Sequence, residues 1–248
     1  MKKLLENDQD QKIQLSSTAT LQSSTPHYHG HRDRLRQRFV EGGPDALPDY
    51  ELLELLLFLV IPMKDVKPLA KDLIAKFGSL SGVLNADIAE LTKIKGISEN
   101  AAIGLKSIQV AGHRLLKQEL MNKPVLNSWS RLMDYCQATM AHETIEHFRV
   151  LFLNKKNELI ADEVQQSGTV DHTPAYPREI IKRALALDAT ALILCHNHPS
   201  GDPKPSQDDI VMTQAVVDAG AAMNIIIHDH IVVSRKGTKS FKQMGLLS

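Results

Sequence analysis

The chain has 248 residues, of which 43% are hydrophobic and 23% charged, and this length and composition fit one large or two small globular domains. Basic and acidic residues balance at 29 each, so no overall field attracts nucleic acid or a membrane, and such affinity would need a local patch. The longest apolar stretch, residues 52–61, is too short to span a bilayer, and the N-terminus lacks the apolar core of a secretory signal. Two cysteines are too few for a disulfide framework, so we expect a cytoplasmic protein.

The first half of the chain is expected to be helical after a polar tail. Residues 1–26 are rich in Gln, Ser, Thr and Asp and show no periodicity, which predicts a disordered tail. Residues 27–120 are predicted to form a small all-α domain, in which Asp49 is expected to cap the second helix. The predicted helices, several of them ended by Gly or Pro, cover residues 32–40, 50–60, 66–77, 87–91 and 99–119.

Two short stretches of this half, FGSL at 77–80 and IKGISENA at 94–101, resemble a helix-hairpin-helix module. In such modules a glycine-rich turn directs backbone N–H groups at a nucleic-acid phosphate. Lys93 and Lys95 favour this interpretation, whereas Ser98 in place of the second glycine and Glu99 beside it oppose it. The turn is therefore either a weak, sequence-independent DNA contact or a packing unit. The helix with arginines at 32, 34, 36 and 38 is likewise either a nucleic-acid patch or a solvated face.

The helical pattern breaks near Pro124, where we expect the domain boundary. Residues 126–248 alternate strands with helices, which predicts a mixed α/β (α+β) domain. Its predicted helices cover 128–140, with Ser128 as the cap, 176–187, and 206–219 up to Gly220. Its predicted strands cover 148–153, 158–165, 191–198 and 224–233, the last as one or two strands.

The most informative stretch joins two histidines to a nearby acid. Side chains alternate along a strand, so His196 and His198 are expected to point the same way from its C-terminal end. A loop rich in Pro and Gly then leads to Ser206 and Asp209 at the start of the next helix. Two imidazoles and one carboxylate leave a fourth position open, as a catalytic zinc site requires. The structural alternative is a capping box of Ser206 and Asp209 beside a hydrogen-bonded pair of histidines.

The sequence HNHPSGDPKPSQDD at 196–209 resembles the JAMM signature H-x-H-x7-S-x2-D of JAB/MPN metalloproteases. Together with FRVLFLNKKNELIADEV, SGTVDHTPAYPREIIKRALAL and DHIVVS, it resembles the RadC-like branch of that fold over most of residues 27–248. The resemblance implies a JAB/MPN-type domain holding one Zn²⁺ per chain through His196, His198 and Asp209. It also implies that Ser206 lies near the metal-bound water.

The family's general acid/base is a glutamate ahead of the first core strand, a position that Glu146 occupies here, with Glu143 one helical turn earlier as the competing residue. The resemblance thus implies a zinc metallopeptidase or isopeptidase. In such an enzyme zinc lowers the pKa of its water to about 7, and the carboxylate passes the proton to the leaving amine.

The alternative function is that of a DNA-associated accessory protein, linked to DNA repair, whose zinc domain is structural or weakly active. The expected partners are therefore a peptide or isopeptide substrate and, weakly, DNA through residues 27–120, with no membrane.

Two further features resemble site residues without completing a site. The stretch His228-Asp229-His230 repeats the H-x-H pattern on a later strand, but no acidic ligand follows it on a shaped loop. This favours a structural role, or a contact behind the metal ligands, over a second metal. Cys195 alternates away from His196 and is expected to be a buried thiol rather than a ligand.

Overall fold

The computed structural model describes residues 30–167 and 176–247, so the predicted tail at 1–26 lies outside the described residues. By its contacts the chain divides into two compact units, residues 1–46 and 47–248. In the first unit, helix α1 (His31–Gly42) is followed by the 3-10 helix η1 (Pro44–Ala46). The helix extends two residues beyond the predicted range 32–40 and ends where Gly43, its C-cap, adopts a φ of 77°.

The helices of the second unit's first part follow the predicted periodicity closely. Its one unpredicted helix is α4, which Ser79 caps by accepting from the Gly82 N–H (3.0 Å). The prediction that Asp49 caps α2 is wrong, because its carboxylate instead accepts from the Leu80 N–H, 31 residues away, at 3.3 Å. The bounds are α2 Asp49–Val60, α3 Lys67–Phe77, α4 Leu80–Asn85, α5 Ile88–Thr92 and α6 Glu99–Leu120.

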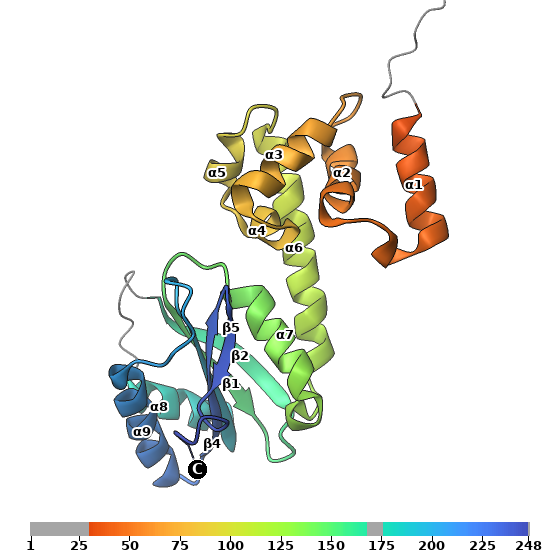
Figure 1. Cartoon of the computed structure of the whole chain (residues 1–248). Helices are drawn as coiled ribbons and strands as arrows, with labels where there is room; N and C mark the ends of the chain where they lie inside the picture. The colour runs from red at the N-terminus through yellow and green to blue at the C-terminus, as the bar shows by residue number, and fades with distance from the viewer. Residues whose placement is uncertain (1–29, 168–175, 248) are drawn as a thin grey trace, which may run out of the picture. The chain divides into compact units, whose positions relative to one another are not determined.

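The predicted hairpin is formed by α5, the turn after it and α6 (Figure 1). Gly96 in the turn has a φ of 106°, a conformation that favours glycine. Ser98 caps α6 by accepting from the Ala101 N–H at 3.2 Å. Ser98, which replaces the second glycine of the helix-hairpin-helix pattern, therefore serves as the N-cap of α6.

The rest of the second unit is an α+β domain, as predicted. Strand β1 (His147–Leu153) pairs antiparallel with β2 (Leu159–Ser167) and β3 (Ala191–Asn197), so the β1–β2 hairpin lies at one edge of the sheet. Strand β4 (Ile226–Ser234) runs parallel to β3 and pairs antiparallel with β5 (Gly237–Ser240). The sheet order is β2-β1-β3-β4-β5.

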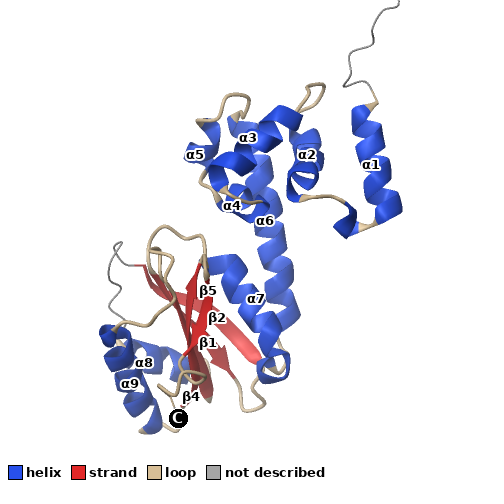
Figure 2. Ribbon diagram, viewed as in Figure 1, coloured by secondary structure: helices blue, strands red, loops and turns tan. Residues whose placement is uncertain are grey.

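Helices cover both faces of this sheet (Figure 2). Helix α7 (Trp129–Met140) packs on one face, and α8 (Pro177–Ala186) and α9 (Gln207–Ala221) pack on the other. Alternate residues of β3 enter the two cores: Ile193 and Cys195 on the α7 side, Leu192 and Leu194 on the α8–α9 side. His196 continues the second series, so the strand's alternation directs it toward α9.

Two predicted helix ends in this domain differ in part from the structure. Ser128 occupies the N-cap position of α7 as predicted, but it also ends a 3-10 helix, η2 (Val125–Ser128), and its side chain makes no cap hydrogen bond. Gly220 does not stop α9 but lies within it, fully packed. A Cβ there would lie 2.7 Å from the Ile225 carbonyl oxygen, so the glycine allows the chain to return closely toward β4.

Strand β4 contains one extra residue opposite β3. Leu192 pairs with Ile227, whereas the next residue, Ile193, pairs with Asp229, so His228 is the bulged residue. The bulge reverses the alternation beyond it: Ile227 packs on the α8–α9 side, but Ile231 packs on the α7 side. His230 is thereby turned toward α9. Among the described residues, no helix is long and apolar enough to cross a bilayer.

Candidate metal centre

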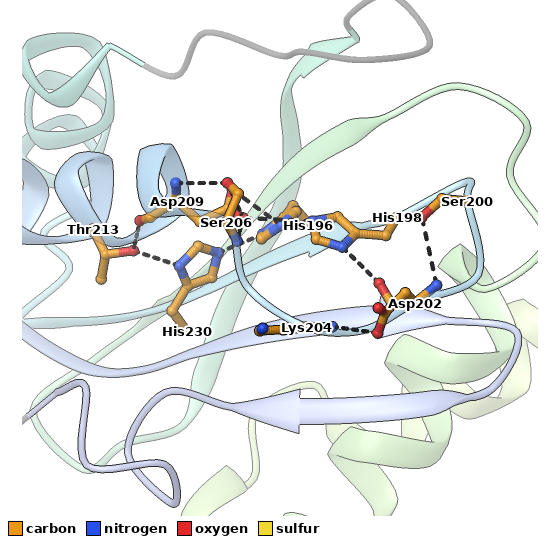
Figure 3. Close-up of polar contacts among 9 residues, drawn as sticks. All are labelled: His196, His198, Ser200, Asp202, Lys204, Ser206, Asp209, Thr213 and His230. Atoms are coloured by element: carbon orange, nitrogen blue, oxygen red, sulfur yellow. Dashed lines mark hydrogen bonds and ion pairs between the residues drawn. The ribbon is translucent and has the colours of Figure 1, made fainter.

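The two histidines of the H-x-H pattern lie at the end of β3, on the side facing α9 (Figure 3). His196 is 1% exposed, and its ring stacks with that of Phe148, its neighbour on β1, at a centroid distance of 6.5 Å. His198 follows the strand and is half-buried. Its Nδ1 lies 2.7 Å from the carbonyl oxygen of Asp202 in the Pro- and Gly-rich loop. A carbonyl only accepts, so His198 carries its proton on Nδ1 and directs the Nε2 lone pair away from the loop.

Asp209 completes a group of three that could hold a metal ion. The Nε2 atoms of His196 and His198 are 2.9 Å apart, and the Asp209 carboxylate oxygens lie 3.3 Å from the first and 3.5 Å from the second. Zinc ligands at about 2.0–2.1 Å in a tetrahedral site are separated by about 3.3 Å. The donor set and the spacing of the donor atoms therefore fit zinc, with a fourth position left for water or substrate.

Asp209 reaches this position through the local structure of the α9 N-terminus. The Ser206 Oγ accepts from the Asp209 N–H (3.1 Å), and the Ser206 N–H donates to the Asp209 carboxylate (2.6 Å), which forms a capping box. Ser206 Oγ–H also donates to that carboxylate at 2.7 Å. The metal-ligand and capping interpretations are thus compatible, since one carboxylate oxygen caps while the other faces His196. The role of Ser206 beside a metal-bound water stays a prediction.

The electrostatics of the group match its geometry. Burial alone would raise the pKa of Asp209, but hydrogen bonds with His196 and His198 hold that pKa far below its usual range. The interaction with Asp209 raises the pKa of His198 in spite of burial. The carboxylate therefore stays ionised, as a metal ligand must.

Glu146 lies immediately before β1, and Asn197 holds the backbone on both sides of it. The buried Asn197 side chain accepts from the His147 N–H (2.8 Å) and donates to the Ile145 carbonyl (3.0 Å). Glu146 is half-buried, and its charge contributes to the raised pKa of His198, after the larger effect of Asp209. The strand that carries the two histidines thus also fixes the segment that carries the glutamate.

Glu143, the competing residue, lies in a different environment. Its carboxylate is 3.6 Å from the His147 Nε2 and its side chain is 49% exposed. It also lines a cavity with Lys106, His142 and Arg235. Neither glutamate has been tested as the acid/base, so the preference for Glu146 stays a prediction.

Three further residues lie around the metal-ligand group. Asn197 and Thr213 were not predicted as site residues, and His230 was predicted only as a structural residue or a contact behind the ligands. Asn197, which lies between the two histidines in the sequence, is the residue that joins β3 to the Glu146 segment. His230 packs against His196, with its Nε2 2.7 Å from the His196 Nδ1, which agrees with a contact behind the ligands. Thr213, one turn after Asp209 on α9, contacts His230 in turn. The helical spacing from Asp209 was the only sequence signal for Thr213.

The opposite face of the sheet holds a separate polar cluster. Cys195 is buried as predicted, with its Sγ 3.7 Å from that of Cys136. Nearby, the Asp162 carboxylate is 2% exposed and accepts from the Tyr135 hydroxyl and from the Arg149 guanidinium at 3.0–3.1 Å. Burial and the Asp162 charge raise the pKa of Tyr135, so its hydroxyl stays protonated. This cluster is a buried ion pair between α7, β1 and β2.

An α+β domain that faces a strand's H-x-H pair toward an aspartate at the next helix N-terminus is organised as a JAB-type domain. Residues 126–246 match the family model of the RadC-like JAB domain, and residues 29–103 match that of the UPF0758 N-terminal domain. The two models cover most of the chain without overlapping. The chain therefore belongs to the RadC-like JAB/MPN family.

Proposed function

We propose that this protein is a zinc-dependent hydrolase that cleaves a peptide or isopeptide bond. The observation that carries the proposal is the convergence of His196 Nε2, His198 Nε2 and the Asp209 carboxylate at tetrahedral spacing, with Glu146 near enough for its charge to act on His198. In such a site zinc supplies an acidified water and polarises the carbonyl of the substrate. A closed structural site would need a fourth protein ligand.

The chain's own residues divide the remaining work. Glu146 accepts the proton of the attacking water and returns it to the leaving nitrogen. Asn197 keeps the backbone of Glu146 in register with the two histidines by its bonds to residues 145 and 147. Ser206 orients the Asp209 carboxylate through two of its hydrogen bonds. This distribution predicts that metal retention and turnover depend on different side chains.

The zinc site is tested by metal analysis of the full-length protein purified without added zinc. We expect about one equivalent per chain. The His196→Ala, His198→Ala double variant should lose it. The matched control is His228→Ala, because His228 belongs to the other H-x-H pattern and contacts Asn157 instead. Zinc content that is unchanged in the double variant would refute the ligand assignment.

The hydrolase activity is tested with a pair of glutamate variants. Glu146→Gln should remain folded and zinc-loaded but lose hydrolysis, whereas Glu143→Gln should keep it. Since the substrate is to be identified, proteomes of cells that carry each variant are compared for a protein or conjugate that accumulates uncleaved only with Glu146→Gln. Cleavage of that species by purified wild-type protein completes the test. Loss of cleavage in Glu143→Gln alone would show that the acid/base has been assigned to the wrong residue.

A second candidate function is weak DNA binding by the α5–α6 hairpin. The observation that favours it is the exposed turn, in which Lys95 and Gly96 precede the N-terminus of α6. Lys93 is less available, because its ammonium pairs with Glu90. A DNA-associated role predicts affinity that falls steeply with salt and does not depend on sequence.

A further inference from the structure

A continuous chain of buried hydrogen bonds runs from His196 to the backbone of α9 (Figure 3). The His196 Nδ1 lies 2.7 Å from the His230 Nε2, and the His230 Nδ1 lies 2.6 Å from the Thr213 Oγ1. The Thr213 hydroxyl in turn lies 2.5 Å from the main-chain carbonyl oxygen of Asp209. His196, His230 and Thr213 are all at most 2% exposed, so water does not compete for these bonds.

The far end of this chain sets its direction. A main-chain carbonyl can only accept, so the single hydroxyl hydrogen of Thr213 is donated to Asp209. The Thr213 oxygen then accepts from the His230 Nδ1–H. His230 is packed against the rings of Phe148 and Phe241, at centroid distances of 5.7 and 4.5 Å, and donates one proton, from Nδ1, to Thr213. With that proton on Nδ1, the Nε2 of His230 carries a lone pair.

The same donor-to-acceptor order fixes the tautomer of His196, the candidate metal ligand. The lone pair on His230 Nε2 accepts from the His196 Nδ1–H, so the His196 ring presents its Nε2 to His198 and Asp209. The Asp202 carbonyl imposes the same tautomer on His198. Nδ1 of each ring is thus engaged in a hydrogen bond, and Nε2 is the atom that each imidazole offers to a metal.

The β4 bulge is what brings His230 into this chain. Under strict alternation His228 and His230 would share a face, but the extra residue at His228 turns His230 toward α9. The bulge is held by Asp229, which accepts from the His230 N–H (2.8 Å), the Lys242 N–H (2.9 Å) and the Ser240 hydroxyl (2.5 Å). His228 instead contacts Asn157 at 2.7 Å.

We propose that Thr213 and His230 are positioning residues that hold His196 in its metal-binding tautomer. This inference rests on the zinc site of the proposed function and deepens it. Without the Thr213 hydroxyl, the His230 Nδ1–H loses its acceptor, and the ring is free to carry its proton on Nε2. That proton would point at the His196 Nδ1 and disfavour the tautomer that ligates through Nε2.

The test compares Thr213→Val with Thr213→Ser in the full-length protein. Valine keeps the branched shape without a hydroxyl, and serine keeps the hydroxyl. Zinc affinity is measured by competition with a chromophoric chelator, which requires no substrate. We expect the dissociation constant to rise about 10–100-fold in Thr213→Val and to stay close to the wild-type value in Thr213→Ser. The control Val216→Ala, a buried truncation one turn further along α9, should leave zinc affinity unchanged.

A second measurement reads the tautomers directly in the wild-type protein. Long-range ¹H–¹⁵N spectra of the zinc-loaded, ¹⁵N-labelled protein should place the His230 proton on Nδ1. A proton on Nε2 would refute the proposed positioning role of Thr213 and His230. Equal zinc affinity in Thr213→Val and Thr213→Ser would also overturn it while leaving the zinc site intact. Wild-type protein that binds no zinc would refute both the positioning role of Thr213 and His230 and the proposed function.

Discussion

Asn197 offers a direct test of how the Glu146 segment is held beside the metal ligands. Asn197→Ala removes the two hydrogen bonds, 2.8 and 3.0 Å long, that join β3 to residues 145 and 147. Each such bond contributes about 1–1.5 kcal/mol, so we expect the free energy of unfolding to fall by roughly 2–3 kcal/mol. For a protein of this size that corresponds to a melting temperature lower by roughly 4–12 °C.

The functional consequence should be selective. The Asn197 side chain points away from the face that carries His196 and His198, so Asn197→Ala is expected to retain zinc. Its hydrolysis should fall toward that of Glu146→Gln, because the glutamate is no longer fixed beside the ligands. Urea unfolding with zinc and with a chelator measures the stability, and metal analysis measures the zinc.

A matched control separates this effect from general destabilisation. Gln137→Ala removes another side-chain amide hydrogen bond in the same domain, a partly buried one from Gln137 Nε2 to the Ser234 carbonyl at 2.9 Å, without touching the Glu146 segment. It should lower stability but leave hydrolysis by the folded protein unchanged. The reasoning fails if Asn197→Ala unfolds at the wild-type urea concentration, or if it loses zinc as fully as the double histidine variant.

Three further changes have defined outcomes. Asp162→Asn should lower the free energy of unfolding by about 3 kcal/mol, measured in urea, because it leaves the partly buried Arg149 without its counter-charge; a loss below 1 kcal/mol would contradict this. Ser206→Ala should cost about 1 kcal/mol through the lost cap and about 10²-fold in hydrolysis, with full activity arguing against any role near the reacting water. Reversal of Lys93 and Lys95 to Glu should weaken DNA binding at low salt in a fluorescence anisotropy assay without altering zinc content, and unchanged or absent binding would leave the hairpin as a packing unit.

The predicted domain limits also call for a direct test. The segments 27–120 and 126–248 stay a prediction about which parts of the chain fold alone. All the proposed ligands and Glu146 lie in 126–248, so this fragment should fold and bind zinc by itself. Circular dichroism and metal analysis of the isolated fragment measure this, and an unfolded fragment would refute the proposed boundary.

The parts of the site that depend on local geometry could be predicted from the amino-acid sequence. Strand alternation brings His196 and His198 to one side of β3, and Ser206 caps the next helix so that Asp209 lies in its first turn. Both features follow from a few neighbouring residues, so they survive whatever surrounds them. The family resemblance added Glu146 as a prediction, which the motif's spacing could not supply.

The tertiary structure alone decided the contacts that join distant segments. Asn197 reaches residues 50 and 52 positions earlier, and Asp49 bonds to Leu80 instead of capping its own helix. The orientation of His230 depends on an extra residue in β4, which exists only when β4 is paired with β3. The physical reason is that a side chain's partner is set by strand register and packing, and neither is encoded in a pattern of a few consecutive residues.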